Sequence, residues 1–309
     1  MKSHSEQKPI FAHALSRRDA LTLCGTAAAA VSLAGIAATA AAAEGVHPTK
    51  RTTFDDPPVV PLRPIVLNAR PAPITIDPAH TALLVVDMQN DFGSEGGMFD
   101  RMGIDVSIIQ RVVPPIARVL DSARGAGMKV VYLKMGFRSD LADLGAPGSP
   151  NRERHLSIGV GKSIQAPDGR ESRILIRDTW GTDIVPGLQP EAGDVVIYKH
   201  RHSGFFETKL DETLQQMGIK FLIVTGCTTS ICVGTTVQDA AFRDYSCIVL
   251  SDCTTEPIGY GLPRSNHDAS LLAIEAVFGW VCGSDELIGG FDDNTTPADS
   301  GLGNKSSEL

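Results

Sequence analysis

Continuous apolar runs rich in β-branched residues recur along the chain, and segments with helical periodicity lie between them. The five runs are 81–86, 129–135, 194–199, 220–226 and 246–252. Runs that lack polar alternation are typical of strands buried on both faces, as in parallel sheets. The helical segments are 104–127, 208–218, 232–245 and 263–280. This alternation predicts an α/β fold with three layers (αβα): a Rossmann-like open sheet, mostly parallel, with helices on both faces.

The start of the chain has the pattern of a bacterial export signal. Arg17 and Arg18 precede an uncharged, alanine-rich run that closes on the small residues Ala41-Ala42-Ala43. We expect residues 1–43 to be a twin-arginine signal peptide, which places the protein in the periplasm. The run is also long enough for a retained membrane anchor, but it is mostly Ala, Gly, Ser and Thr, so its insertion energy is weak. We expect cleavage and no stable membrane anchor.

The remaining chain divides by composition into an arm, a domain and a tail. Residues 44–74 are rich in proline and predict an extended arm, and residues 289–309 predict a disordered tail. The periodic strands and helices fall within residues 75–288. Within this domain the stretch 136–193 has little periodicity, which is typical of a functional cover or a subunit contact.

Composition narrows the partners and the cysteine chemistry. The chain is 42% hydrophobic with a net charge of −8 and no basic block, which argues against nucleic acid and anionic membrane surfaces. Removal of the signal leaves five cysteines, so at least one thiol has no partner within the chain. No second C-x-x-C half is present, which argues against a zinc clip. Whether Cys247 and Cys253 pair stays open.

Three reactive side chains follow three of the predicted strands. Asp87 ends the first run, Lys199 ends the third, and Cys232 stands shortly after the fourth, where a helix is expected to begin. Ligands of open α/β sheets bind beyond the carboxyl ends of the strands, so we expect these residues at one edge. Each also has a structural interpretation: a turn cap, a solvated lysine and a buried apolar cysteine.

The three side chains together would support acyl transfer. A helix N-terminus and a nearby ammonium lower the pKa of a thiol, and a carboxylate can take its proton and return it to a leaving nitrogen. Backbone N–H groups of the loop 226–232 could hold an oxyanion. Attack of Cys232 on an amide or ureido carbon is therefore plausible.

Three stretches resemble one known family. VVDMQNDF at 85–92, YKHRHSGFFETKLD at 198–211 and VTGCTTSICVGTTVQDAAFRDY at 224–245 are similar to the isochorismatase-like cysteine hydrolases. The resemblance covers roughly residues 75–285, so 75–288 is identified as an isochorismatase-like hydrolase domain. LKMGF, GAPGSPN, SGFFET and FGWV resemble the ureidoacrylate amidohydrolases and biuret hydrolases within it.

The resemblance implies an Asp–Lys–Cys triad: Asp87 as general base and acid, Lys199 as orienting cation and Cys232 as nucleophile. It also implies a cis Cys227–Thr228 bond and an oxyanion hole formed by the N–H groups of Thr228 and Cys232. The implied activity is metal-independent hydrolysis of a C–N bond in a small amide or ureido (carbamoyl) substrate through a thioester. No cofactor is implied. The implied partners are the substrate and water, in a homo-oligomer of two to four subunits.

The substrate pocket is less constrained. The positions that match pocket residues of the family are Phe92, Asn90, His202 and Glu256. Phe92 fits a core position equally well. His202 replaces the family's tyrosine and Glu256 its glutamine, and a carboxylate there would favour substrates with N–H donors or positive charge. These two differences leave the exact substrate open.

Two alternatives remain. The chain could be a nicotinamidase or another small-amide amidase of the same family, or a non-catalytic binding member. Nicotinamidase-like members carry a metal motif near the second strand, but the matching stretch here, LKMGFRSD, has no histidine. His200 and His202 lack an evident third ligand, so we expect no bound metal.

Overall fold

The structure, a computed structural model, describes residues 64–263 and 265–295. The predicted signal peptide, most of the predicted arm and the end of the tail lie outside these ranges. No helix among the described residues is long and apolar enough to cross a membrane.

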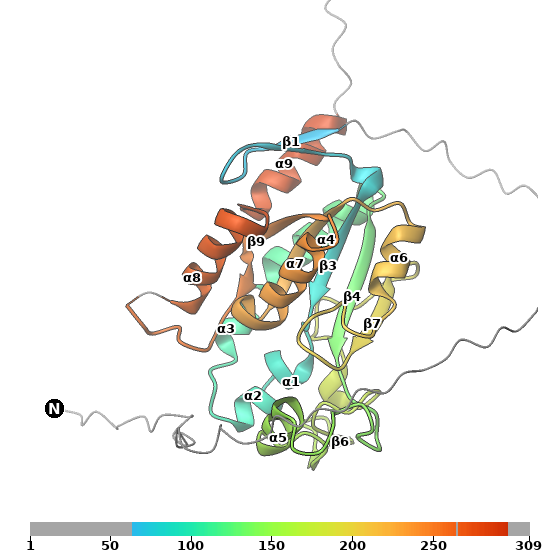
Figure 1. The fold of residues 1–309 in the computed structure, drawn as a ribbon, viewed down its shortest axis with the longest axis vertical. Helices are drawn as coiled ribbons and strands as arrows, with labels where there is room; N and C mark the ends of the chain where they lie inside the picture. The colour runs from blue at the N-terminus through green and yellow to red at the C-terminus, as the bar shows by residue number, and fades with distance from the viewer. Residues whose placement is uncertain (1–63, 264, 296–309) are drawn as a thin grey trace, which may run out of the picture. The chain divides into compact units, whose positions relative to one another are not determined.

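A six-stranded parallel sheet forms the centre of the fold (Figure 1). Its strands are β3 (Thr81–Val86), β4 (Lys129–Met135), β7 (Val195–Lys199), β8 (Phe221–Cys227), β9 (Ser246–Thr255) and β10 (Trp280–Cys282). They are ordered β10-β9-β8-β3-β4-β7, and every neighbouring pair is parallel. This is the strand order of the Rossmann fold, which confirms the predicted fold class. The order reverses between β3 and β8, where such sheets bind their ligands.

Helices cover both faces of this sheet. Alternate side chains of β3 divide between the two cores: Leu83 and Val85 face one, whereas Leu84 and Val86 face the other. The first core includes residues of α3 (Ser107–Gln110), α4 (Val113–Gly125) and α9 (Ser284–Thr295). The second includes residues of α6 (Leu210–Gln216), α7 (Gly234–Ala241) and α8 (Asn266–Ala273). Both faces of the strands are therefore buried, which explains their unbroken apolar runs.

The predicted helices exist, with different ends. Pro114 and Pro115 occupy the first turn of α4, so they divide the predicted segment 104–127 and restart the helix after α3. The segment predicted at 232–245 begins earlier, with the π-helical turn η3 (Thr229–Val233) leading into α7. A second π-helical turn, η4 (Ile274–Phe278), follows α8.

The two ends of the described chain depart from prediction. Residues 64–74 contribute to a hairpin of β1 (Ile65–Leu67) and β2 (Ile74–Ile76) rather than a wholly extended arm, and Arg70 exchanges two backbone hydrogen bonds with Val281. The predicted disordered tail is wrong for its first residues, because α9 continues to Thr295 and buries Phe291. A single aromatic side chain among polar residues was too weak a signal to show this packing.

The insert at 136–193 has local structure of its own. It contains α5 (Pro150–Ser157), a hairpin of β5 (Ser163–Gln165) and β6 (Glu171–Arg173), and the 3₁₀ turn η2 (Trp180–Thr182). It packs near the short helices that follow β3, α1 (Asn90–Gly93) and α2 (Met98–Arg101). The insert is therefore attached to the carboxyl end of the sheet.

Candidate active site

Asp87, Lys199 and Cys232 meet at the carboxyl edge of the sheet. Asp87 follows β3 directly, Lys199 is the last residue of β7, and Cys232 lies in η3 after β8. The Lys199 Nζ atom lies 2.8 Å from Oδ2 of Asp87, with side chains 0% and 1% exposed. The structure thus joins the three residues selected from the sequence in one buried cluster.

Lys199 is held over the end of the intervening strand. Its Nζ donates to the Sδ atom of Met135, the last residue of β4, at 3.6 Å and to the carbonyl oxygen of Arg201 at 3.3 Å. A fully buried ammonium needs such partners, because its desolvation is costly. Asp87 remains the only carboxylate that is ion-paired with it among the described residues.

The carboxylate of Asp87 retains capacity to accept a proton. Burial raises its pKa above the ordinary value, although Lys199 and the Cys232 thiol act in the opposite direction. Within the described chain neither of its oxygens has an aligned hydrogen-bond donor, so the contact with Lys199 is an ion pair without hydrogen-bond geometry. An ion-paired carboxylate with a free oxygen beside a thiol is suited to act as a base.

The Cys232 thiol stays protonated at rest. Burial raises its pKa, Asp87 raises it further, and Lys199 only partly offsets the two. This differs from the expectation that the helix start and Lys199 would stabilise a thiolate, because desolvation of the fully buried sulfur has the larger effect. A base would therefore have to take this proton before the sulfur could act as a nucleophile.

The backbone around the cluster is unusual in two places. Asp87 has φ 52°, in the left-handed region that Asp tolerates better than most residues. Gly226 has φ 109°, and a Cβ atom there would lie 2.0 Å from the carbonyl oxygen of Val86. Only glycine permits this close approach of β8 to β3, which brings the loop after β8 against Asp87.

The second cysteine of the loop contacts the same aspartate. Cys227 is buried, and its thiol donates to the backbone carbonyl oxygen of Asp87 at 3.3 Å. The Cys227–Thr228 peptide bond is cis, as the resemblance implied. All five cysteines among the described residues are free thiols, so Cys247 and Cys253 do not pair.

His202 lies next to the Cys232 thiol. Its Nδ1 atom is 3.8 Å from the Sγ atom of Cys232, and its ring centroid is 5.6 Å from that of His155 in α5. Burial, followed by the charge of Lys199, lowers the pKa of His202 to about 4. A neutral imidazole beside the sulfur of Cys232 therefore occupies this position, which the sequence assigned to the substrate pocket.

The Glu256 carboxylate forms hydrogen bonds within the protein and does not face a substrate. It is buried; its Oε2 atom accepts from the backbone N–H and the hydroxyl of Ser230, and its Oε1 atom accepts from the N–H of Ile258. Charge-assisted bonds of this kind hold a loop firmly. The predicted effect of this carboxylate on substrate charge does not fit these contacts, which instead position the turn that carries Cys232.

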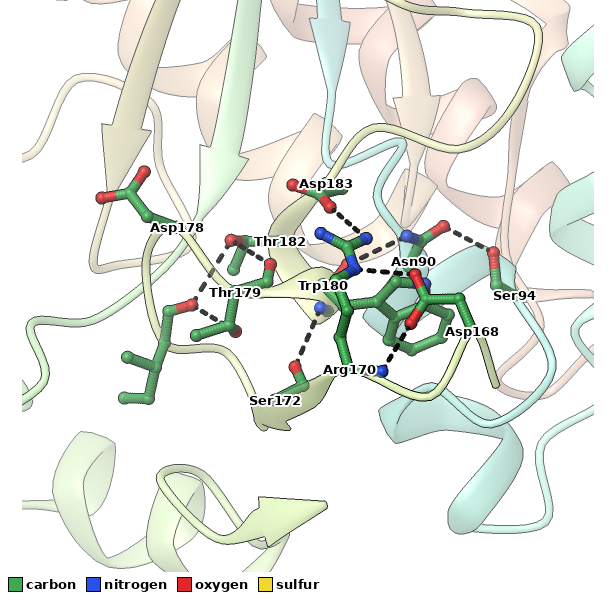
Figure 2. Close-up of polar contacts among 12 residues, drawn as sticks. Asn90, Ser94, Asp168, Arg170, Ser172, Asp178, Thr179, Trp180, Thr182 and Asp183 are labelled. Carbon is green, nitrogen blue, oxygen red and sulfur yellow. Dashed lines mark hydrogen bonds and ion pairs between the residues drawn. The ribbon is translucent and has the colours of Figure 1, made fainter. Parts of the chain in front are cut away.

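Asn90 and Phe92 make their contacts with α1, α2 and the insert. Asn90 donates to the carbonyl oxygen of Trp180 and accepts from Ser94 (Figure 2). It lines an open cavity of about 670 Å³ whose lining includes none of Asp87, Lys199 and Cys232. Phe92 packs edge-on against Phe99 in the core on the sheet face opposite that of Cys232. These contacts favour the structural interpretation of Phe92.

Two polar residues that the sequence did not single out hold the insert and the strand ends. The Gln89 side chain forms two hydrogen bonds with the backbone of Met135: it donates to the carbonyl oxygen and accepts from the N–H. Asp91 is buried and accepts from the N–H groups of Met98 and Leu175, which joins α2 to the insert. Their one sequence signal was their position just after β3, next to Asp87.

The donor atoms near the cluster do not form a metal centre. No group of three His, Cys, Asp or Glu side chains in the described ranges is placed to hold a metal ion. His200, which the sequence offered as a ligand beside His202, is instead bound to Glu207 at 3.0 Å.

Comparison with known proteins places this geometry in a family. The model of the isochorismatase domain matches residues 81–286. The ureidoacrylate amidohydrolase RutB of Caulobacter segnis is 37% identical over 236 residues, 76% of this chain and 96% of that protein. RutB of Methylobacterium radiotolerans is 41% identical over 217 residues, 70% and 81% of the two chains. The crystal structure of a cysteine hydrolase from Pseudomonas syringae has a TM-score of 0.59 and 30% identity over 71% of this chain and 95% of its own. This chain belongs to the isochorismatase domain family.

Proposed function

We propose that this protein is a cysteine amidohydrolase that cleaves a C–N bond of a small amide or ureido substrate, of the ureidoacrylate or biuret type. The observation that carries the proposal is the buried Lys199–Asp87 ion pair, 2.8 Å long, beside the Cys232 thiol. The names of the relatives, ureidoacrylate amidohydrolases, support the same reaction class.

The first half-reaction transfers the acyl or carbamoyl group to sulfur. Asp87 takes the thiol proton as Sγ of Cys232 attacks the substrate carbonyl carbon, and the carbonyl oxygen becomes an oxyanion. We propose that the backbone N–H groups of Thr228 and Cys232 hold this oxyanion. The C–N bond then breaks, Asp87 returns the proton to the leaving nitrogen, and ammonia or an amine departs. A thioester or S-carbamoyl group remains on Cys232.

The second half-reaction restores the thiol. Asp87 takes a proton from a water molecule, whose oxygen attacks the thioester carbon. The C–S bond breaks, and Asp87 gives its proton to the departing sulfur. Lys199 stays charged throughout and stabilises Asp87 whenever that carboxylate is ionised. Side chains of the protein account for every proton in the cycle, so the scheme uses no metal.

An ammonia-release screen tests this proposal. The substrates are ureidoacrylate, biuret, carbamoyl amino acids, nicotinamide and simple amides. We expect turnover of an amide or ureido member that is lost in Cys232→Ser and kept in Cys247→Ala, which alters a buried cysteine of the same core cluster. Near-normal hydrolysis by Cys232→Ser would disprove the mechanism. Activity on nicotinamide alone, with metal dependence, would favour the nicotinamidase alternative.

We also propose that the chain is exported to the periplasm by the twin-arginine route. The support is the Arg17-Arg18 pair followed by an alanine-rich run and an A-x-A site. Replacing both arginines by lysine should retain the protein in the cytoplasm, as measured by cell fractionation. Unchanged export of that variant would contradict the proposal.

We further propose a homo-oligomer of two to four subunits. The support is the exposure of large apolar side chains on the α7 and η4 side, where Phe242 is 72% and Val277 is 73% exposed. Light scattering after size exclusion would measure the mass. A monomer at micromolar concentration would contradict this proposal.

A further inference from the structure

The imidazoles of His202 and His155 lie beside the nucleophile and take no part in the mechanism above. His202 comes from the loop after β7, whereas His155 comes from α5 of the insert. Their ring planes are tilted by 31° at a centroid separation of 5.6 Å, and His202 Nδ1 is 3.8 Å from Sγ of Cys232. The insert and the edge of the sheet therefore build one wall of the site together.

The contacts of the sulfur determine which nitrogen of His202 carries hydrogen. Lys199 can only donate, and the Asp87 carboxylate can only accept and has no aligned donor of its own among the described residues, so we assign the single thiol hydrogen to the Asp87 side. The sulfur then has only lone pairs to offer His202, whose Nδ1 must donate. In a neutral imidazole the other nitrogen, Nε2, is then an acceptor.

The contacts of His155 give the same tautomer. Its Nδ1 atom lies 2.6 Å from the carbonyl oxygen of Asn151, which only accepts. Nδ1 of His155 is therefore the donor, and Nε2 carries the lone pair. Burial lowers the pKa of both histidines, that of His202 to about 4, so both rings are neutral at neutral pH.

Both Nε2 atoms remain available to a ligand. Across the described residues no protein donor reaches either atom, and neither atom is among the fully buried polar atoms without a partner, so neither is completely sealed from solvent. His202 is also only half-buried, unlike Asp87, Lys199 and Cys232. A carbonyl carbon that approaches Sγ to about 3–3.5 Å brings its own substituents within reach of this ring.

We propose that His202, supported by His155, is a specificity-determining residue that accepts a hydrogen bond from a substrate N–H through Nε2 and thereby selects ureido groups over simple amides. The inference rests on the proposed function. A ureido group, –NH–CO–NH₂, carries N–H on both sides of its carbonyl, whereas a simple amide carries it only on the leaving side. A neutral acceptor pairs with this extra N–H and is left unpaired by a methylene group.

Isosteric substrate pairs isolate this hydrogen bond. Biuret differs from malonamide, and ureidoacrylate from its methylene analogue, only by N–H in place of CH₂. The quantity measured is the ratio of kcat/KM for the two members of a pair, which cancels any change in the amount of active enzyme. Two variants separate the ring nitrogens: His202→Gln keeps a polar group near Nε2, whereas His202→Asn keeps one near Nδ1. His202→Phe removes both.

We expect wild type to prefer the ureido member of at least one pair. The kcat/KM ratio should fall about ten-fold in His202→Asn and His202→Phe. His202→Gln should retain most of the wild-type ratio. Equal ratios in all variants would overturn the inference, as would a preference kept by His202→Asn and lost by His202→Gln. If wild type hydrolyses malonamide through Cys232 without any ureido preference, the inference fails and the proposed function stands. If Cys232→Ser is as active as wild type, the proposed function fails.

Discussion

Lys199 Nζ and Asp87 Oδ2 lie 2.8 Å apart across the end of β4, and neither side chain is exposed to solvent by more than 1%. The two residues come from strands separated by β4 in the sheet, so the pair depends on the parallel register of three strands. Removing one partner leaves a buried charge without compensation, which costs more than removing both.

Lys199→Met should destabilise the fold by about 3–5 kcal/mol or force Asp87 to stay protonated. The double variant Asp87→Asn/Lys199→Met should recover part of that loss. Urea unfolding of the two single variants and the double variant measures the coupling. Purely additive losses would show that the ion pair contributes nothing to stability.

Asp87→Asn should also lower kcat/KM for the substrate about 10²–10⁴-fold, because the base is lost. Steady-state kinetics of ammonia release measures this loss.

The raised pKa of Cys232 predicts slow alkylation near neutral pH. Burial keeps the thiol protonated, so the rate of modification by iodoacetamide should be low at pH 7 and should rise with pH without reaching a plateau below pH 9. Lys199→Met should slow it further, because the cation that favours thiolate is absent. Mass spectrometry of Cys232-containing peptides over time gives the rate. Fast labelling that does not change between pH 6 and pH 8 would contradict the assignment of a resting thiol.

The sheet and the meeting of Asp87, Lys199 and Cys232 could be predicted from sequence, because five strands are continuous apolar runs and three of these runs lead to a reactive residue. Asp87 and Lys199 lie at the ends of such runs, and parallel strands bring their carboxyl ends to one edge. The three-residue strand β10 was missed because it is too short to show periodicity. The rest of the site depends on tertiary contacts that spacing does not encode.

Glu256 and His155 illustrate this limit. The sequence offered Glu256 as a pocket residue, but folding places Ser230 and Ile258 against its carboxylate. His155 lies in an aperiodic insert, and only the packing of α5 brings it to His202. The hydrogen bonds of Glu256 and the ring contact of His155 therefore show where these side chains act, which their sequence positions did not.

Asp91 should make stability fall as pH rises through the acid range. Its pKa is raised from 3.8 to about 6, mainly by burial, while the N–H groups of Leu175 and Met98 partly offset the shift. Between these values the folded state holds a proton that the unfolded state has lost, so the free energy of unfolding decreases with pH. The shift corresponds to about 3 kcal/mol across pH 4 to 6.

Asp91→Asn cannot titrate at this position, so the difference between its unfolding curves and those of wild type isolates the effect. We expect wild type to lose stability relative to Asp91→Asn as pH rises from 4 to 6. Asp121→Asn, at an exposed position in α4, is the control. A difference curve that is flat, or that rises with pH, would contradict a protonated Asp91 in the folded protein.

Gly181 should be intolerant of alanine because of the same carboxylate. A Cβ atom at Gly181 would lie 2.2 Å from Oδ2 of Asp91, the oxygen that accepts from the N–H of Leu175 at 2.7 Å. Gly181→Ala should therefore displace the carboxylate, loosen the insert and destabilise the fold by about 1–3 kcal/mol. Because the insert also carries His155, kcat/KM should fall as well.

Gly125→Ala is the matched control for this change. Gly125 ends α4 and has no heavy atom within 4 Å of an added Cβ, so alanine there should be neutral or stabilising by up to about 1 kcal/mol. Thermal unfolding of both variants, repeated in an Asp91→Ala background, separates the clash from other effects. We expect most of the cost of Gly181→Ala to disappear in that background, since the atoms it would strike are gone. An unchanged cost would show that Gly181 is required for a reason other than its contact with Asp91.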